Sequence, residues 1–176
     1  MSETSKKHKA SAPKQLKFAV FVCSTSRYQE LQKGEKITDV SGDTIEALLK
    51  NAGHIVSSKE IIADDKRQIA EAVKIVLNSL ELDAAIFCGG TGIARKDVTI
   101  ETVQPFLEKV LLGFGEIFRR LSYDKLGSAA VMSRAIAGVA KGKALFCIPG
   151  SPDAVRISVE MLILPESPHI VRHIRE

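Results

Sequence analysis

The stretch DAAIFCGGTG, residues 83–92, decides the fold class of this chain. After Asp83 comes an apolar run without polar alternation, which is typical of a strand covered on both faces of a sheet. Three glycines and a threonine follow at once, so the strand passes into backbone that largely lacks Cβ atoms. The stretch therefore predicts a buried strand that opens into a loop able to approach a ligand closely.

Four further segments have the composition of strands. They are residues 16–23, 54–62, 135–140 and 143–148, the last two joined by a hairpin turn at Lys141-Gly142. Apolar residues at three-to-four spacing predict helices between them. The first is predicted from Gly42 to about residue 51, and the second from Asp64 or Asp65 to about residue 80. The others are predicted over residues 99–112, from residue 116 onward, and over residues 154–164. Residues 24–42 are expected to form a long loop.

The alternation of strands and helices predicts an α/β protein with a largely parallel sheet, right-handed connections and helices on both faces. The hairpin adds an antiparallel edge to this three-layer sandwich. The chain has 176 residues, 45% of them hydrophobic, which is typical of one domain with a substantial core. We expect that domain to span residues 16–176.

Residues 1–15 are expected to be a disordered, basic tail. The first fourteen residues hold four lysines and one glutamate, which account for three of the four net positive charges and much of the pI near 9.0. No basic stripe interleaved with aromatic residues appears elsewhere, so nucleic-acid binding is disfavoured. A solubilising arm is the preferred interpretation of the tail.

The cysteines and the apolar runs indicate the cellular setting. Cys23, Cys88 and Cys147 stand far apart with no Cys-x-x-Cys spacing, which favours buried thiols in a reducing compartment over zinc or a disulfide. The tail lacks the apolar region of a signal peptide, and the longest apolar runs are far shorter than the roughly 20 residues of a membrane-spanning helix. We expect a soluble, cytoplasmic protein that does not bind membranes.

Open sheets of this kind bind ligands beyond the carboxyl ends of their strands. Four predicted loops lie there, at residues 24–42, 63–65, 89–98 and 149–153. In the third, Gly89-Gly90-Thr91-Gly92 suits an anionic group such as phosphate, because backbone N–H groups can come close to it. The spacing matches neither a Walker loop nor a Gly-x-Gly-x-x-Gly site, and a tight structural turn is about equally compatible with it.

Two acidic residues in these loops invite a cation. Asp64 and Asp97 would offer hard oxygen ligands for magnesium beside the phosphates of a nucleotide. The plainer interpretation has Asp64 capping the following helix and Asp97 solvated on its loop. Capping and catalysis are compatible, and the adjacent Asp65 leaves open which acid is functional.

Other polar residues on the same rim have two interpretations each. Arg27, Arg95 and Lys96 would neutralise phosphate or simply be surface charges. Ser41 is an N-cap or a ligand contact, and Asp43 is expected to be an N-cap. Residues 149–151 precede a helix N-terminus, which attracts anions but is also an ordinary turn. Arg134 would contact a ligand or pair with an acid such as Glu116, whereas His169 and His173 are expected to be exposed.

The chain resembles the MoaB/Mog family of molybdenum-cofactor biosynthesis proteins over about residues 16–164. The resemblance rests on the order and spacing of five motifs: CGGTG at 88–92, RKDVT at 95–99, GFGE at 113–116, SRA at 133–135 and PGS at 149–151. The run 113–138 is closer to the MoaB branch. Ile100 stands where the family commonly has proline, and Ser26-Arg27 replaces a Ser-Asp pair typical of the Mog branch.

The resemblance implies a Rossmann-like fold and adenylylation of molybdopterin with ATP and magnesium, giving adenylyl-molybdopterin and pyrophosphate. It implies homotrimers or hexamers, and a possible contact with the downstream metal-insertion protein. Asp64 and Asp97 would be the catalytic, magnesium-binding acids. The implied substrate and nucleotide contacts are Ser24, Ser26, Arg27, Ser41, Gly89, Gly90, Thr91, Gly92, Glu116, Ser133, Arg134, Pro149, Gly150 and Ser151.

Three other functions remain as alternatives. The chain would bind molybdopterin as a non-catalytic carrier or scaffold, although the presence of both acids favours the enzyme. It would hydrolyse nucleotides like a related domain of the competence-damage family, but a second domain would then be expected. A nucleic-acid role of the tail predicts steeply salt-dependent binding that is lost when residues 1–15 are removed.

Overall fold

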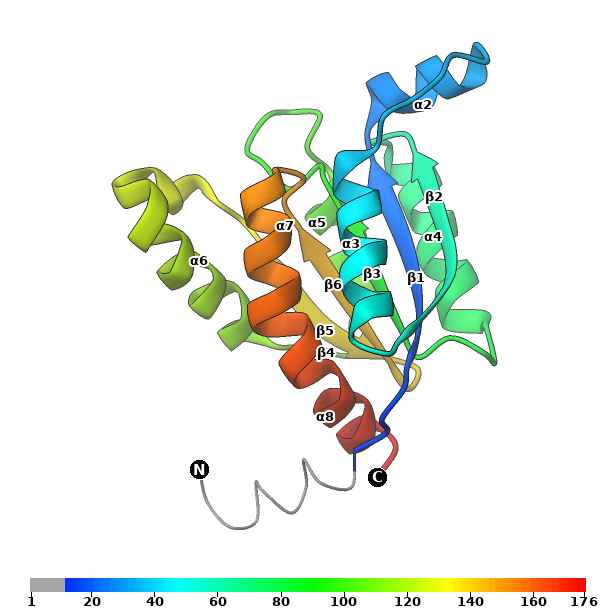
Figure 1. The fold of residues 1–176 in the computed structure, drawn as a ribbon, viewed down its shortest axis with the longest axis vertical. Helices are drawn as coiled ribbons and strands as arrows, with labels where there is room; N and C mark the ends of the chain where they lie inside the picture. Colours follow the sequence, from blue (N-terminus) through cyan, green and yellow to red (C-terminus); the bar gives the residue numbers. More distant parts are fainter. Residues whose placement is uncertain (1–11) are drawn as a thin grey trace.

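A computed structural model describes residues 12–176 and contains one six-stranded sheet (Figure 1). The strand order is β2-β1-β3-β6-β5-β4, and every pairing from β2 to β6 is parallel. β5 and β4 continue the sheet antiparallel. The strands are β1 (Lys17–Cys23), β2 (Ile55–Ile62), β3 (Ala84–Cys88), β4 (Lys109–Val110), β5 (Ile136–Ala140) and β6 (Lys143–Ile148).

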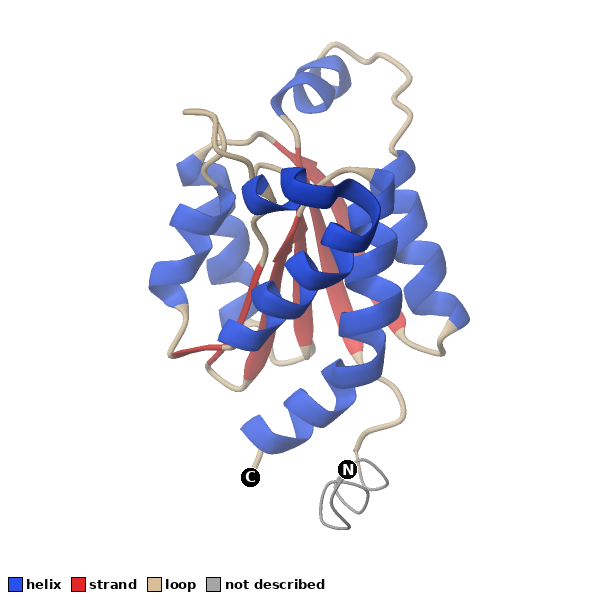
Figure 2. Ribbon diagram, turned by 90° about the vertical axis from the view of Figure 1, so that its left-hand side faces the viewer, coloured by secondary structure: helices blue, strands red, loops and turns tan. Residues whose placement is uncertain are grey.

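Helices cover both faces of the sheet, as the view along its edge makes plain (Figure 2). One face packs against α3, α7 and α8, and the other against α4 and α5. α6 lies outside the β5 edge, where Phe118 packs with residues of α7. The helices are α2 (Thr25–Gln32), α3 (Val40–Asn51), α4 (Lys66–Asn78), α5 (Thr99–Val103), α6 (Leu112–Leu126), α7 (Pro152–Ser158) and α8 (Leu164–Ile174), with short turns η1 (Gln104–Phe106), η2 (Gly127–Met132) and the π-helical η3 (Val159–Ile163).

The predicted fold class and its antiparallel edge are confirmed. β1, β3 and β6 are buried along almost their whole length, which explains their unbroken apolar sequences. The hairpin turns at Lys141 and Gly142, whose φ values of 46° and 74° suit the two-residue turn that joins antiparallel strands. Sheet and helices thus form the three layers that the alternation indicates.

The helix predicted over residues 99–112 is wrong in its second half. α5 ends at Val103, and a 3-10 turn follows that contains Pro105. Proline lacks a backbone N–H and its ring disfavours a continuing helix, so the chain leaves the helical path there. Residues 109–110 then form β4 against β5, and a new helix begins at Leu112.

The loop predicted over residues 24–42 contains a helix. α2 projects beyond the carboxyl edge of the sheet (Figure 1) and buries none of its residues. It therefore has no apolar stripe, which is the signal that sequence periodicity depends on. The last helical run also exceeds its prediction, because π-helical η3 leads directly into α8, which continues to Ile174.

The sequence also predicts a disordered N-terminal tail and the absence of a membrane-spanning helix. Residues 1–11 of the predicted tail lie outside the described residues, so its disorder and the domain boundary at residue 16 stay predictions. Among residues 12–176, no helix is both long and apolar enough to span a bilayer.

Candidate functional site

The site lies where the order of strands in the sheet reverses along the chain. From β1 the chain crosses to β2 on one side, and from β2 it crosses back to β3 on the other, so a switch point lies between β1 and β3. The strands there are parallel, and their carboxyl ends share one edge, at the top of Figure 1. Open α/β sheets bind ligands at this position.

The glycine loop begins directly at this edge. Gly89 donates its N–H to the Ile148 carbonyl at 2.9 Å, which ties the loop to the end of β6. Its φ is +105°, and a Cβ there would lie 2.5 Å from the Cys23 carbonyl oxygen. Glycine is therefore required both by the backbone conformation and by the close approach to β1.

Gly90 forms the floor of a small polar cradle. Its φ is +61°, and a Cβ on it would lie 2.3 Å from Asp64 Oδ1 and 2.4 Å from Thr99 Oγ1. Within residues 12–176, the backbone N–H groups of Gly90, Thr91 and Gly92 donate to no protein acceptor. Free N–H groups in a loop of this shape are suited to an anion.

A cleft of about 380 Å³ opens over this loop. It brings together nine of the residues predicted as ligand contacts or acids, and adds Met132 from η2. Its lining is Gly89, Gly90, Thr91, Gly92, Asp97, Met132, Ser133, Arg134, Pro149 and Gly150. A larger cavity of about 540 Å³ lies between β2 and α4, away from the glycine loop.

Asp64 supplies a half-buried carboxylate beside the cradle. Its Oδ1 is buried and has no hydrogen-bond partner, while the Val98 backbone N–H lies near the carboxyl group. Burial raises the pKa of Asp64 above the usual value, the Val98 N–H lowers it, and the charge of Asp97 raises it further. An orphaned carboxylate oxygen in a polar recess is suited to a cation.

The prediction that Asp64 caps α4 is wrong. Asp65 occupies the N-cap, where its Oδ1 accepts from the Arg67 N–H at 2.9 Å and the Gln68 N–H at 3.1 Å. Asp64 is thereby left out of the helix and directed toward Gly90. The structure thus separates the two adjacent acids into a capping residue and a site residue.

Asp97 lies beside Gly92 at the other end of the glycine loop sequence. Its Oδ2 accepts the Ala94 N–H at 2.8 Å, and the same oxygen would lie 2.6 Å from a Cβ on Gly92. The carboxylate is half-buried in the cleft, so it is not simply solvated on its loop. Arg95 and Lys96 are exposed on the loop between them.

Arg134 holds the glycine loop in shape. Its Nε donates to the Thr91 carbonyl at 2.9 Å and its Nη2 to the Gly92 carbonyl at 2.6 Å. Its Nη1 pairs with Glu101 at 2.6 Å, and this bond lowers the pKa of the Glu101 carboxyl. The suggested pairing of Arg134 with an acid is therefore confirmed, although the acid is Glu101 and not Glu116, and the guanidinium acts mainly as a brace.

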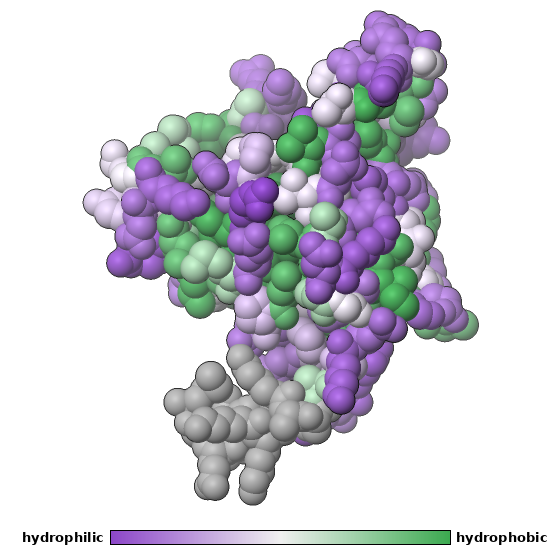
Figure 3. Space-filling view, viewed as in Figure 1, coloured by the Kyte–Doolittle hydropathy of each residue, from purple (hydrophilic) through white to green (hydrophobic). Residues whose placement is uncertain are grey.

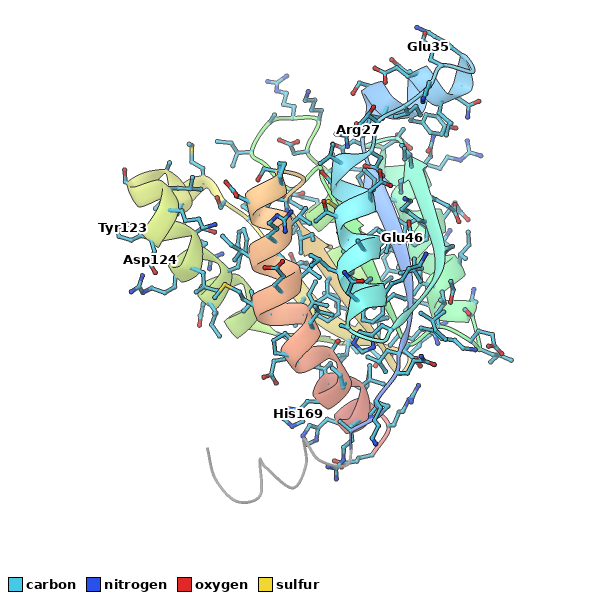
Figure 4. The ribbon with its side chains drawn as sticks, in the orientation of Figure 1. Arg27, Glu35, Glu46, Tyr123, Asp124 and His169 are labelled. Carbon is cyan, nitrogen blue, oxygen red and sulfur yellow. The ribbon has the colours of Figure 1, made fainter. Side chains whose placement is uncertain are left out.

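A second wall of the site comes from α2 and α3. Arg27, labelled in Figure 4 at the base of α2, pairs with Asp39 at 3.4 Å. Asp39 is the N-cap of α3 and accepts the Gly42 N–H at 3.1 Å, but its Oδ2 is buried without a partner. Ser41 donates to the Gly150 carbonyl at 2.8 Å, which joins this wall to the cleft.

Asp39 and Thr99 are functional candidates that sequence reasoning missed. Asp39 has no distinct sequence signal, because Ser41 and Asp43 also have N-cap chemistry; Asp43 lies in the first helical turn and pairs with Lys59, so its predicted role as the N-cap is wrong. Thr99 is fully buried, with its Oγ1 against Gly90 and lacking a partner. A threonine at a helix start gives no sequence signal that its hydroxyl is buried.

The remaining predicted residues lie outside the cleft. Ser24 and Ser26 follow β1, where their hydroxyls approach to 3.4 Å. Ser151 is exposed at the N-cap of α7 and makes no side-chain capping bond. Glu116 is exposed in the second turn of α6 and does not line the cleft, so the structure does not bring it to the site.

The cysteines take no part as nucleophiles. All three are buried free thiols, as predicted. Burial raises the pKa of Cys23 to about 12, although the Thr99 hydroxyl opposes this. Within residues 12–176, no cluster of three or more His, Cys, Asp or Glu side chains could hold a metal by itself. A cation at Asp64 and Asp97 would need further oxygen ligands from water or a bound phosphate.

Comparison with known proteins identifies the family. The family model described as a probable molybdopterin binding domain matches residues 19–169. The chain belongs to the MoaB/Mog family. Molybdenum cofactor biosynthesis protein B of Bacillus cereus is 44% identical to it over 164 residues, which are 93% of each chain. A probable molybdopterin adenylyltransferase of Methanocaldococcus jannaschii is 40% identical and covers 93% of this chain and 96% of its own.

The MoaB/Mog fold is also found in a solved structure. The crystal structure of the tungsten cofactor synthesizing protein MoaB from Pyrococcus furiosus superposes with a TM-score of 0.82 at 38% identity. It covers 94% of this chain and all of that one. The predicted family is therefore confirmed, and four of the five motifs that indicated it contribute residues to the cleft, whereas residues 113–116 do not.

Proposed function

We propose that this chain adenylylates molybdopterin in the cleft over the glycine loop, as a step of molybdenum-cofactor biosynthesis. One observation carries the proposal. The loop at Gly90 offers free backbone N–H groups for phosphate beside the partnerless Asp64 Oδ1, so an anion and a cation can be bound side by side. The adenylyltransferase name of one relative supports the same reaction.

In this reaction an oxygen of the molybdopterin phosphate attacks the α-phosphorus of ATP. A phosphorus–oxygen bond forms there, the bond from that phosphorus to the β-bridging oxygen breaks, and pyrophosphate leaves. The reaction needs no covalent nucleophile from the protein, so the described residues of the cleft contribute alignment and charge neutralisation. The N–H groups of residues 90–92 would hold phosphate oxygens, and Arg134 would keep those N–H groups in position.

The residues present suit a magnesium ion. Asp64 and Asp97 flank the loop and offer two carboxylates, one of them with a buried, partnerless oxygen. Magnesium in proteins usually keeps several waters and binds through one or two carboxylates plus substrate phosphates, so two acids suffice. When bound, it would neutralise negative charge on the phosphates during transfer.

A non-catalytic carrier or scaffold role is the alternative. A carrier needs a pterin pocket but no cation site, so it has no use for two carboxylates beside a phosphate-binding loop. The raised pKa of Asp64 is a cost that a pure binding protein could remove by placing asparagine there. We therefore favour the enzyme.

Pyrophosphate release tests the proposal. Purified protein is incubated with molybdopterin, ATP and magnesium, alongside Asp97→Asn, which keeps an acceptor for the Ala94 N–H but removes the charge. We expect the wild type to release pyrophosphate and the Asp97→Asn variant to release less of it. A wild type that binds molybdopterin and releases no pyrophosphate would establish the carrier instead.

We also propose a homo-oligomer, a trimer or hexamer, that works in the cytoplasm and hands its product to the metal-insertion protein. Large apolar side chains are exposed along α6 and the following turn, and Figure 3 shows apolar surface in that region. They include Leu112, Ile117, Leu126 and Val131. Light scattering at micromolar concentration would distinguish a trimer or hexamer from a monomer.

A further inference from the structure

A pair of histidines faces each other on α8, at the opposite end of the molecule from the cleft. His169 and His173 are four residues apart, so their side chains lie on one side of the helix. Their Nε2 atoms are 2.9 Å apart. His169, labelled at the lower end of Figure 4, has only 22% of its side chain exposed, less than the sequence suggested, whereas His173 has 47%.

Each ring is held from its other side by a carboxylate. His169 Nδ1 lies 3.2 Å from Glu166 Oε2, and His173 Nδ1 lies 3.1 Å from Glu176 Oε2. A carboxylate accepts a hydrogen bond, so each Nδ1 carries its proton and each Nε2 is left as the ring's acceptor. Two ring nitrogens then face each other at one point, an arrangement that suits a shared cation.

We propose that His169 and His173 form a binding site for a divalent transition-metal ion, with Zn²⁺ as the representative ion. The ion lies between the two Nε2 atoms and takes water at its other positions. Neutral imidazole nitrogen suits zinc, copper and nickel, and two histidines four residues apart on a helix are a known zinc-ligand spacing. Nothing in the proposed adenylylation uses this pair.

The geometry needs little adjustment to take the ion. Tetrahedral zinc with Zn–N bonds of about 2.05 Å separates its ligand nitrogens by about 3.3 Å. The two Nε2 atoms, now at 2.9 Å, would have to move apart by only a few tenths of an ångström. Glu166 and Glu176 already make the carboxylate–histidine contacts that orient metal-binding imidazoles.

Space and charge around the pair are compatible with a hydrated ion. A cleft of about 310 Å³ opens beside both histidines, between α8 and the β4–β5 edge. Lys109 lines it and would oppose a cation, and Arg172 pairs with Glu176 at 3.2 Å. Within residues 12–176, the carboxylates of Glu166 and Glu176 lie beside the imidazoles and oppose these two positive charges.

The ion would cross-link His169 and His173 across the helical turn that follows Pro168. Proline lacks the N–H that would bond to the preceding turn, so α8 is weakened there. His169 and His173 converge only while residues 169–173 are helical, and binding therefore stabilises that turn. Metal binding would therefore stabilise α8, which packs on the same face of the sheet as α3 and α7.

Titration calorimetry with ZnCl₂ on the chelator-treated full chain tests the proposal. One Zn²⁺ per chain is expected, and at about 100-fold excess over Kd the melting temperature should rise by about 5–10 °C. His169→Gln and His173→Gln should each abolish this binding, and the double variant should lose no more than either single one. That non-additivity is the signature of a chelate.

Glu166→Gln should weaken Zn²⁺ binding about 10–100-fold by releasing the His169 ring. Glu160→Gln is the matched control, since its side chain is also 43% exposed on the same helical run but contacts neither histidine. Circular dichroism establishes that each variant is folded. The proposal would be overturned if the wild type bound no Zn²⁺. It would also be overturned if folded His169→Gln and His173→Gln bound Zn²⁺ with unchanged affinity.

Discussion

Gly90→Ala tests how the cradle works, and Gly53→Ala provides its matched control. Both glycines have a left-handed backbone, with φ of +61° and +86°. A Cβ on Gly53 meets nothing within 4 Å, whereas one on Gly90 lies 2.3 Å from Asp64 Oδ1. Both variants therefore place alanine in a left-handed backbone conformation, but only Gly90→Ala also introduces a steric clash.

The magnitudes follow from these contacts. An alanine in the left-handed region costs about 1–2 kcal/mol, so each variant should melt about 2–8 °C below the wild type. In Gly90→Ala the Asp64 carboxylate must also move, because 2.3 Å is well inside the 3.0 Å that real Cβ contacts respect. A misplacement of about 1 Å in a catalytic site can reduce the rate about 100-fold, or about 2.7 kcal/mol.

The assay is kcat/KM for pyrophosphate release, corrected for the folded fraction measured by circular dichroism. We expect Gly53→Ala to keep wild-type activity and Gly90→Ala to lose about 100-fold. If both folded variants were equally active, Gly90 would be a structural turn only, and the reasoning that assigns phosphate and Asp64 to one cradle would be refuted.

Three other predictions concern stability and reactivity. Asp64→Asn should raise the melting temperature at neutral pH, because burial raises the pKa of Asp64 and so disfavours its ionised form in the folded protein. This advantage should vanish at acidic pH, where the wild-type carboxyl is protonated both folded and unfolded; an equal gain at every pH would contradict the cause. Arg134→Gln should lower the melting temperature by about 4–8 °C, and Arg134→Lys should restore little of it, since one ammonium cannot reach two carbonyls and Glu101. Cys23 should resist alkylation in the native state at neutral pH, as followed by mass spectrometry, because burial raises the pKa of its thiol to about 12; rapid labelling of folded protein would count against this.

The strands and the glycine loop could be predicted because local sequence determines them. Residues 84–88 are buried on both faces, so they need no polar alternation, and the glycines at 89 and 90 occupy backbone that other residues avoid. α2 could not be predicted in the same way, because a helix that buries nothing leaves no periodic pattern. The end of α5 was predictable in principle from Pro105.

The finer parts of the site depend on long-range contacts that no local pattern records. Arg134 braces carbonyls more than forty positions earlier in the chain, and its bonds could not be distinguished from ligand contacts in the sequence. Asp64 and Asp65 have the same local chemistry. Only the direction of the chain at the start of α4 makes one a cap and leaves the other at the cradle.

The most direct test of the proposed function is transfer of label from α-³²P-ATP to molybdopterin by Asp64→Asn and Asp65→Asn. Asparagine caps a helix about as well as aspartate, so Asp65→Asn should stay folded and transfer label like the wild type. Asp64→Asn should stay folded and transfer label at least 100-fold more slowly, by about 2.7 kcal/mol or more. Equal transfer by both variants, or none by the wild type, would contradict the proposal that Asp64 serves an adenylyltransferase.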